Sequence, residues 1–170
     1  MMNFNRLLSL LIALTLILGA FAGCAKSEPP SCRKILGAIM DAEVGLPAGK
    51  IYDMRAADGE DEYLSDALLC ALYGEGGKPV ARDSWIDCAL FLSVTEHPCE
   101  LAVFYCDSHD AAIDTARILS ARLDAIKSSK NPQAYAHLFD AASVTVCGNF
   151  VLMIISSDTQ NALKIAKKLI

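Results

Sequence analysis

The chain of 170 residues has no excess of positive charge, and this absence limits the partners it can bind by electrostatics. It has 15 lysine and arginine residues against 20 aspartate and glutamate residues, a formal net charge of -5. Nucleic acids and anionic lipid surfaces are bound largely through clusters of basic side chains. We therefore expect no nucleic-acid partner and no polybasic attachment to a membrane.

The chain also lacks the residue spacings of common catalytic and metal sites. It has three histidines and no Cys-x-x-Cys pair. The remaining candidates are Cys106 with His109, which are spaced like half of a zinc site, the Ser-x-x-Lys of Ser31 and Lys34, the acidic run 58–62 and the glycine-rich stretch 74–78. The pair of Cys106 and His109 lacks the second ligand pair of a zinc site. The acidic run lacks the spacing of a calcium loop, and the glycine-rich stretch lacks that of a phosphate loop. We predict no catalytic, metal-binding or cofactor-binding residues, and no cofactor.

Long hydrophobic runs are absent except at the N-terminus. Arg6 is the only charged residue before position 26, and the apolar run 7–23 follows it. A positive start followed by such a run is typical of a secretory signal peptide. The run is shorter than the roughly 20 apolar residues that span a bilayer, so we interpret it as a signal rather than a membrane span.

The end of this run resembles a bacterial lipobox, the cleavage motif of lipoprotein signal peptides. It reads Phe21-Ala22-Gly23-Cys24, with Phe21 where leucine is usual. The resemblance implies that Cys24 carries a diacylglycerol lipid and becomes the new N-terminus, on the outer face of the bacterial cytoplasmic membrane. Two acyl chains give stable anchoring, which one chain does not. The alternative is an ordinary secretory cleavage near Ala20 or Ala22, with Cys24 an incidental thiol.

The remaining six cysteines allow two interpretations. An even number in an exported chain is compatible with three disulfides. Four of the six, Cys70, Cys88, Cys106 and Cys147, lie in apolar segments, where free cysteine behaves as a small hydrophobic residue. We therefore expect mostly free, buried thiols.

The chain divides into three parts. Residues 1–23 form the predicted signal peptide, residues 24–31 the lipidated cysteine and a short linker, and residues 32–170 a single domain. Pro29 and Pro30 favour an extended linker. We therefore expect the domain to lie close to the membrane surface.

Hydrophobic periodicity predicts the elements of this domain. Helical spacing favours helices over 32–42, with Ser31 as a possible N-cap, and over 61–73, 108–127 and 157–170, where Ser157 with Gln160 resembles a capping box. Alternation favours strands over 85–94, 100–106, 143–147 and 150–156, with a short extended piece over 51–54. Short turns, the second of them Gly148-Asn149, join the strands into two hairpins. The predicted fold class is α+β, with two antiparallel β-hairpins forming a four-stranded sheet in ββαββα order, preceded by N-terminal helical segments.

Both faces of the predicted sheet are apolar, which an antiparallel sheet with one solvated face would not be. We expect helix 108–127 and the last helix to cover one face together. The segments within 32–73 would then cover the other, unless a partner protein does. Alternation places Ile86, Leu90, Leu92, Val94, Leu101 and Val103 on one face, and Ala89, Phe91, Ala102 and Phe104 on the other.

Three stretches, together with the lipobox, resemble one lipoprotein family. They begin Tyr63-Leu-Ser-Asp-Ala-Leu-Leu, His97-Pro-Cys-Glu-Leu-Ala-Val and Val144-Thr-Val-Cys-Gly-Asn-Phe. The chain is similar over about residues 33–170 to lipoproteins of Gram-positive anaerobes that carry domain of unknown function 4358. The resemblance supports the fold and the extracytoplasmic location, and it implies no activity. We expect a monomeric, non-enzymatic module that binds a protein or small ligand. An enzyme acting on envelope material is the alternative.

Overall fold

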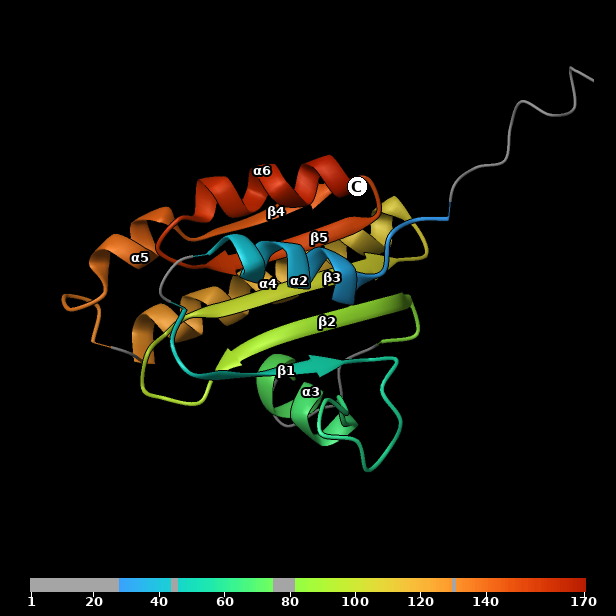
Figure 1. Ribbon diagram of the computed structural model, residues 1–170, viewed down its shortest axis with the longest axis horizontal. Coiled ribbons are helices and arrows are strands. Elements are labelled where there is room, and N and C mark those ends of the chain that lie inside the picture. Colours follow the sequence, from blue (N-terminus) through green and yellow to red (C-terminus); the bar gives the residue numbers. More distant parts are fainter. Residues whose placement is uncertain (1–27, 44–45, 75–81, 130) are drawn as a thin grey trace, which may run out of the picture.

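The computed structural model describes residues 28–43, 46–74, 82–129 and 131–170. The predicted signal peptide, Cys24 and residues 75–78 of the glycine-rich stretch lie outside them. The described residues fold into an α+β domain, as predicted, with helices on both faces of one antiparallel sheet (Figure 1). The elements are α2 (Cys32–Ala42), β1 (Gly49–Asp53), α3 (Asp66–Tyr73), β2 (Trp85–Ser93), β3 (Glu100–Cys106), α4 (His109–Ser129), α5 (Ala136–Ala141), β4 (Ser143–Cys147), β5 (Phe150–Ile155) and α6 (Thr159–Leu169).

The sheet has five strands, in the order β1-β2-β3-β5-β4, so the prediction of four strands in ββαββα order was wrong in detail. The two hairpins, β2–β3 and β4–β5, form as predicted, and β3 pairs with β5 to join them. The additional strand is β1, which pairs antiparallel with β2. The sequence indicated an extended piece there, but its partner lies about 40 residues further on, beyond the reach of a local pattern.

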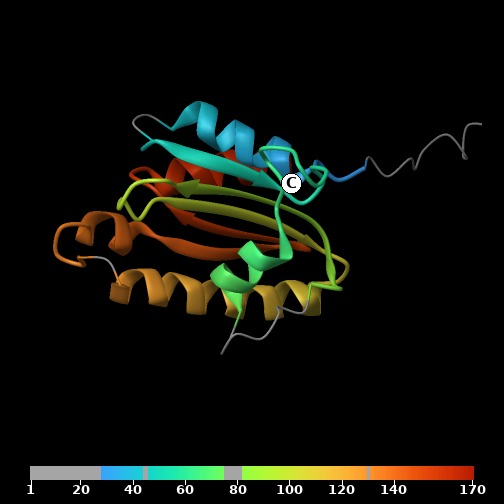
Figure 2. The same cartoon turned by 90° about the horizontal axis from the view of Figure 1, so that it is seen from below.

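Each face of the sheet has its own hydrophobic cluster. The α4 face packs against α3, α4 and α5, and the α2 face packs against α2 and α6 (Figure 2). The expectation that α4 and α6 cover the same face was therefore wrong. Each helix has a single apolar stripe, and two stripes on opposite faces bury more of a sheet that is apolar on both sides. The sheet contributes Cys88, Leu90, Ala102, Phe104, Val151, Met153 and Ile155 to the α4 face, and Ala89, Phe91, Leu101, Val103, Phe150, Leu152 and Ile154 to the α2 face.

The register between β2 and β3 also differs from the predicted grouping of side chains. Leu90 lies opposite Ala102 and Phe91 opposite Leu101, so these pairs share a face. Alternation assigns faces within one strand, but the turn decides the phase between two strands, and a shift of one residue exchanges the faces.

An irregularity at the start of β2 moves Ile86 out of the core. The register shifts between Trp85 and Asp87, so Trp85 joins Cys88 in the α4-face cluster and Ile86 is 52% exposed. The Trp85 indole donates a hydrogen bond of 2.8 Å to the Thr115 hydroxyl on α4. A β-bulge of this kind redirects one side chain, which strict alternation does not predict.

Capping residues explain where the helices begin. Ser31 and Ser65 accept hydrogen bonds from the backbone of the first turns of α2 and α3. The first cap was predicted, whereas α3 begins later than the predicted position 61. Helix α6 is capped by Asp158 rather than by the predicted Ser157.

Candidate functional site

The predicted lipid attachment site, Cys24, lies outside the described residues, so its lipidation stays a prediction. Among the helices of the described ranges, none combines the length and the apolar character needed to cross a bilayer.

The structure does not bring Cys106 and His109 together as metal ligands. Cys106 is buried, and its Sγ lies 3.4 Å from the Thr115 hydroxyl. The Nδ1 of His109 lies 3.0 Å from the Gly148 carbonyl oxygen in the β4–β5 turn. Within the part of the chain that the structure describes, no group of three or more His, Cys, Asp or Glu residues is arranged to hold a metal.

The acidic run 58–62 and the Ser-x-x-Lys motif stabilise local structure. Glu62 accepts two hydrogen bonds from Arg33 on α2, at 3.0 and 3.1 Å, and these lower the pKa of the Glu62 carboxyl. Glu60 accepts from the backbone N–H of Ala57 at 2.8 Å. In the second motif, the Ser31 hydroxyl accepts from the backbone N–H of Lys34 as the cap of α2. The oxygens of these residues are therefore used within the fold.

A buried carboxylate that the sequence analysis did not identify connects α2 to β2. Asp87 is 1% exposed and accepts hydrogen bonds from the backbone N–H of Cys32 at 2.8 Å and of Cys88 at 3.0 Å. Arg55 completes the set with an ion pair at 3.0 Å. Cys32 is the first residue of α2, where the helix dipole favours a negative charge. The carboxylate therefore positions α2 on the sheet.

A second buried carboxylate connects β3 to α3 and α4. Glu100 is 4% exposed and accepts from both Nε and Nη2 of Arg122, at 3.3 and 2.8 Å. The Tyr73 hydroxyl donates to the same carboxylate at 3.4 Å. Burial and then the Glu100 charge raise the pKa of Tyr73 well above its usual value, which keeps the phenol protonated as a donor. A charged residue within an apolar strand was the available sequence signal for Glu100 and Asp87, because such residues are buried only when paired.

The thiols contribute to the core rather than to a reactive site. Burial raises the pKa of Cys99 to about 12, with smaller contributions from Glu43 and Glu100. Its neighbour His97 uses Nδ1 to accept the backbone N–H of Cys99 at 3.2 Å, which closes the β2–β3 turn. A thiol that stays protonated at neutral pH is a poor nucleophile. The prediction of mostly free thiols is confirmed, since Cys32, Cys88, Cys99, Cys106 and Cys147 are free.

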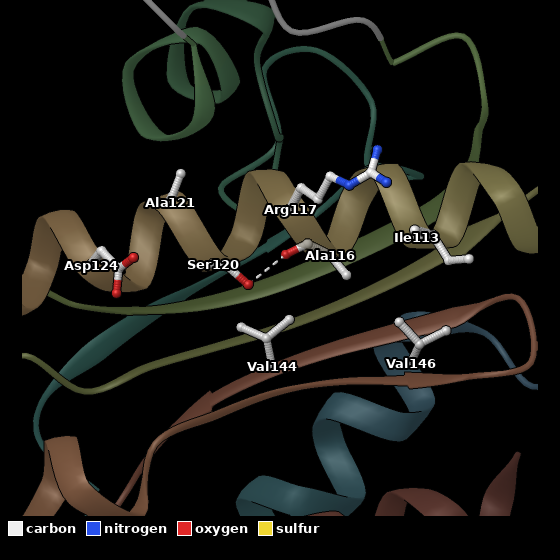
Figure 3. Close-up of a pocket in the computed structure, with 8 residues that line it drawn as sticks. All are labelled: Ile113, Ala116, Arg117, Ser120, Ala121, Asp124, Val144 and Val146. Carbon is white, nitrogen blue, oxygen red and sulfur yellow. Dashed lines mark hydrogen bonds between the residues drawn. The ribbon is translucent and has the colours of Figure 1, made fainter.

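A groove of about 550 Å³ lies between α4 and β4 (Figure 3). Val144 and Val146 on β4 point towards α4 and face Ile113 and Ala116 across it, which makes the floor apolar. The polar side chains along its helical wall are Arg117, Ser120 and Asp124. The Ser120 hydroxyl donates to the Ala116 carbonyl oxygen at 2.8 Å. The oxygen of the Ser120 hydroxyl can therefore still accept a hydrogen bond from a ligand in the groove.

The groove is open because the helical layer ends before the sheet does. Helix α4 packs over β3, β5 and β4, and α3 packs beside α4 over the β2 side of the sheet. On its other side lies β4, the edge strand, and no helix of the described ranges packs beyond it. Ile113 is therefore 37% exposed.

No family model matches this chain. No match was found among curated proteins or among solved structures.

Proposed function

We propose that this chain is a lipid-tethered, extracytoplasmic binding module that engages its partner through the groove between α4 and β4. The signal peptide pattern and the lipobox at Cys24 support the location. The resemblance to lipoproteins carrying domain of unknown function 4358 supports the same assignment.

The open groove beside an edge strand is the observation that carries the binding function. It combines an apolar floor with a few polar groups, which is the usual composition of a binding surface. By contrast, the two buried acids, Asp87 and Glu100, are held by donors from the fold itself. A catalytic acid or base must reach the substrate. The arrangement therefore favours binding over the alternative of an envelope-acting enzyme.

Replacing the anchoring cysteine tests the location. Cys24→Ala should release the protein from membranes and abolish labelling by a clickable fatty acid, because the thioether cannot form. Membrane association and label incorporation are measured after fractionation. Cys147→Ala, which removes a different thiol, should change neither. Unchanged membrane association of Cys24→Ala, with no label in the parent protein, would refute the lipid anchor.

Photo-crosslinking from the groove tests the binding surface. A photoreactive residue at Ser120 in the anchored protein should give a discrete adduct with one envelope component. Ser128 is the matched control, because it is an exposed serine on the same helix with the same hydrogen bond to the preceding turn, outside the groove. Adducts are compared by mass after irradiation of intact cells. Equal adduct yields at the two positions would count against the groove as the binding surface.

A further inference from the structure

Among the described residues, none pairs with the backbone groups that Val144 and Val146 carry on the outer edge of β4. In the β3–β5 pair, Cys106 donates its N–H to the Asn149 carbonyl oxygen at 2.9 Å. Successive residues of an antiparallel strand bond to opposite neighbours, so Phe150, Leu152 and Ile154 bond to β4. Their partners in register are Cys147, Thr145 and Ser143. The N–H and C=O groups of Val144 and Val146 therefore point outward.

The opposite edge of the sheet is protected, and this contrast makes β4 distinctive. At β1, the outward N–H of Asp53 donates to the Glu62 carbonyl oxygen at 2.7 Å, and the strand carries the charged residue Lys50. Charged side chains and covering segments are common ways to block an edge strand. Strand β4 reads Ser-Val-Thr-Val-Cys, without charge or proline. Within the described ranges, no backbone group bonds to the outer edge of Val144 or Val146.

We propose that this edge of β4 receives an extended segment of a partner protein as a sixth strand. This proposal rests on the proposed binding function. Main-chain hydrogen bonds to Val144 and Val146 hold the segment, and its alternate side chains enter the α4–β4 groove. Those side chains are apolar, because they lie next to Val144, Val146 and Ile113.

Charge at the groove specifies one residue of the segment. The Arg117 guanidinium pairs with Asp114 and points away from β4 (Figure 3), so it does not face the segment. Asp124 is the acidic residue of the groove lining. The segment therefore carries a basic residue near Asp124.

A second copy of this chain fits the edge less well. Pairing two β4 strands about a two-fold axis leaves three strand spacings between the β5 strands, about 14 Å. Because α4 packs over β5 and its two neighbours, the axes of the two α4 helices would also lie about 14 Å apart. Packed helices lie 8–10 Å apart, so the two α4 helices would not contact each other closely. Self-pairing would extend the sheet and leave both grooves unfilled.

A synthetic peptide tests the proposal directly. The probe is an extended peptide with valines at alternate positions and a lysine at one end. Backbone amide exchange is followed by NMR on the mature chain. In the free protein, the amides of Val144 and Val146 should exchange faster than those of Thr145 and Cys147, and the peptide should protect them. N-methylation of the peptide at the residues facing β4 removes its donors and should weaken binding about tenfold or more.

Two variants complete the test. Val146→Pro removes an outward N–H without breaking a β4–β5 hydrogen bond, so it should keep the fold and lose peptide protection. Ile51→Pro is the matched control, because it removes an outward N–H from β1 at the opposite edge of the sheet without breaking a β1–β2 hydrogen bond, and it should leave peptide protection at β4 unchanged. Equal binding of the N-methylated peptide would overturn strand addition while leaving the groove as a binding surface. No peptide protection at Val144 and Val146, or their protection in a concentration-dependent dimer, would also overturn it.

Discussion

Deleting residues 25–76 should convert the mature domain, which we expect to be a monomer, into a fragment that aggregates or self-associates. The deletion removes α2 and so uncovers Ala89, Phe91, Leu101 and Val103 on the α2 face, and it removes β1 from the edge of β2. An exposed apolar surface of this kind drives association. Size-exclusion chromatography with light scattering would compare the fragment with residues 25–170. A soluble, monomeric and cooperatively folded fragment would show that α2 is not the required cover.

A pair of substitutions in α2 isolates this effect without shortening the chain. Ile35 and Ile39 are fully buried on the α2 face, so Ile35→Ala with Ile39→Ala should lower the free energy of unfolding by about 4–8 kcal/mol. That loss is comparable with the whole stability of an ordinary domain. Lys34→Ser with Asp41→Ser changes the exposed side of the same helix without changing the net charge. This control should unfold in urea close to the parent.

Arg122→Met should lower the free energy of unfolding by about 3 kcal/mol, because it leaves the buried Glu100 carboxylate without its charged partner. Arg117→Met is the matched control on the same helix, where the ion pair with Asp114 is mostly exposed. That change should cost less than about 1 kcal/mol. Urea unfolding of both variants measures the difference. Equal losses would show that the Glu100 site is not a buried ion pair in solution.

A compensating variant distinguishes the charge from the packing of the long side chain. In the double variant Glu100→Gln with Arg122→Met, no ionised carboxylate is left buried, so part of the lost stability should return. Tyr73→Phe removes one donor to Glu100 and should cost about 1 kcal/mol. A double variant no more stable than Arg122→Met alone would indicate that lost packing dominates.

Local patterns predicted most elements because their signals lie within a few residues. The periodicity of Ile35, Leu36 and Ile39 predicted α2, and its cap Ser31 was predicted with it. Alternation and the Gly148-Asn149 turn predicted the second hairpin, where Gly148 has the positive φ of 60° that glycine tolerates. The α+β class follows from these elements.

The candidate site could not be predicted in the same way. The helix over 108–127 was predicted, but the groove beside it exists because the sheet extends beyond the helical layer at β4. The pairing of Glu100 with Arg122 joins residues 22 positions apart on different elements. Neither feature has a local pattern.

The sequence by itself determined which segments form helices and strands and that both faces of the sheet must be covered, because hydrophobic periodicity and caps act over one or two turns of chain. It also determined the negative charge and the signal that predicts export. Only the tertiary structure decided the fifth strand, the placement of α4 and α6 on opposite faces, the bulge that exposes Ile86 and the open edge of β4. The physical reason is that strand register and helix docking depend on contacts between distant residues, where a shift of one position exchanges the two faces of a strand.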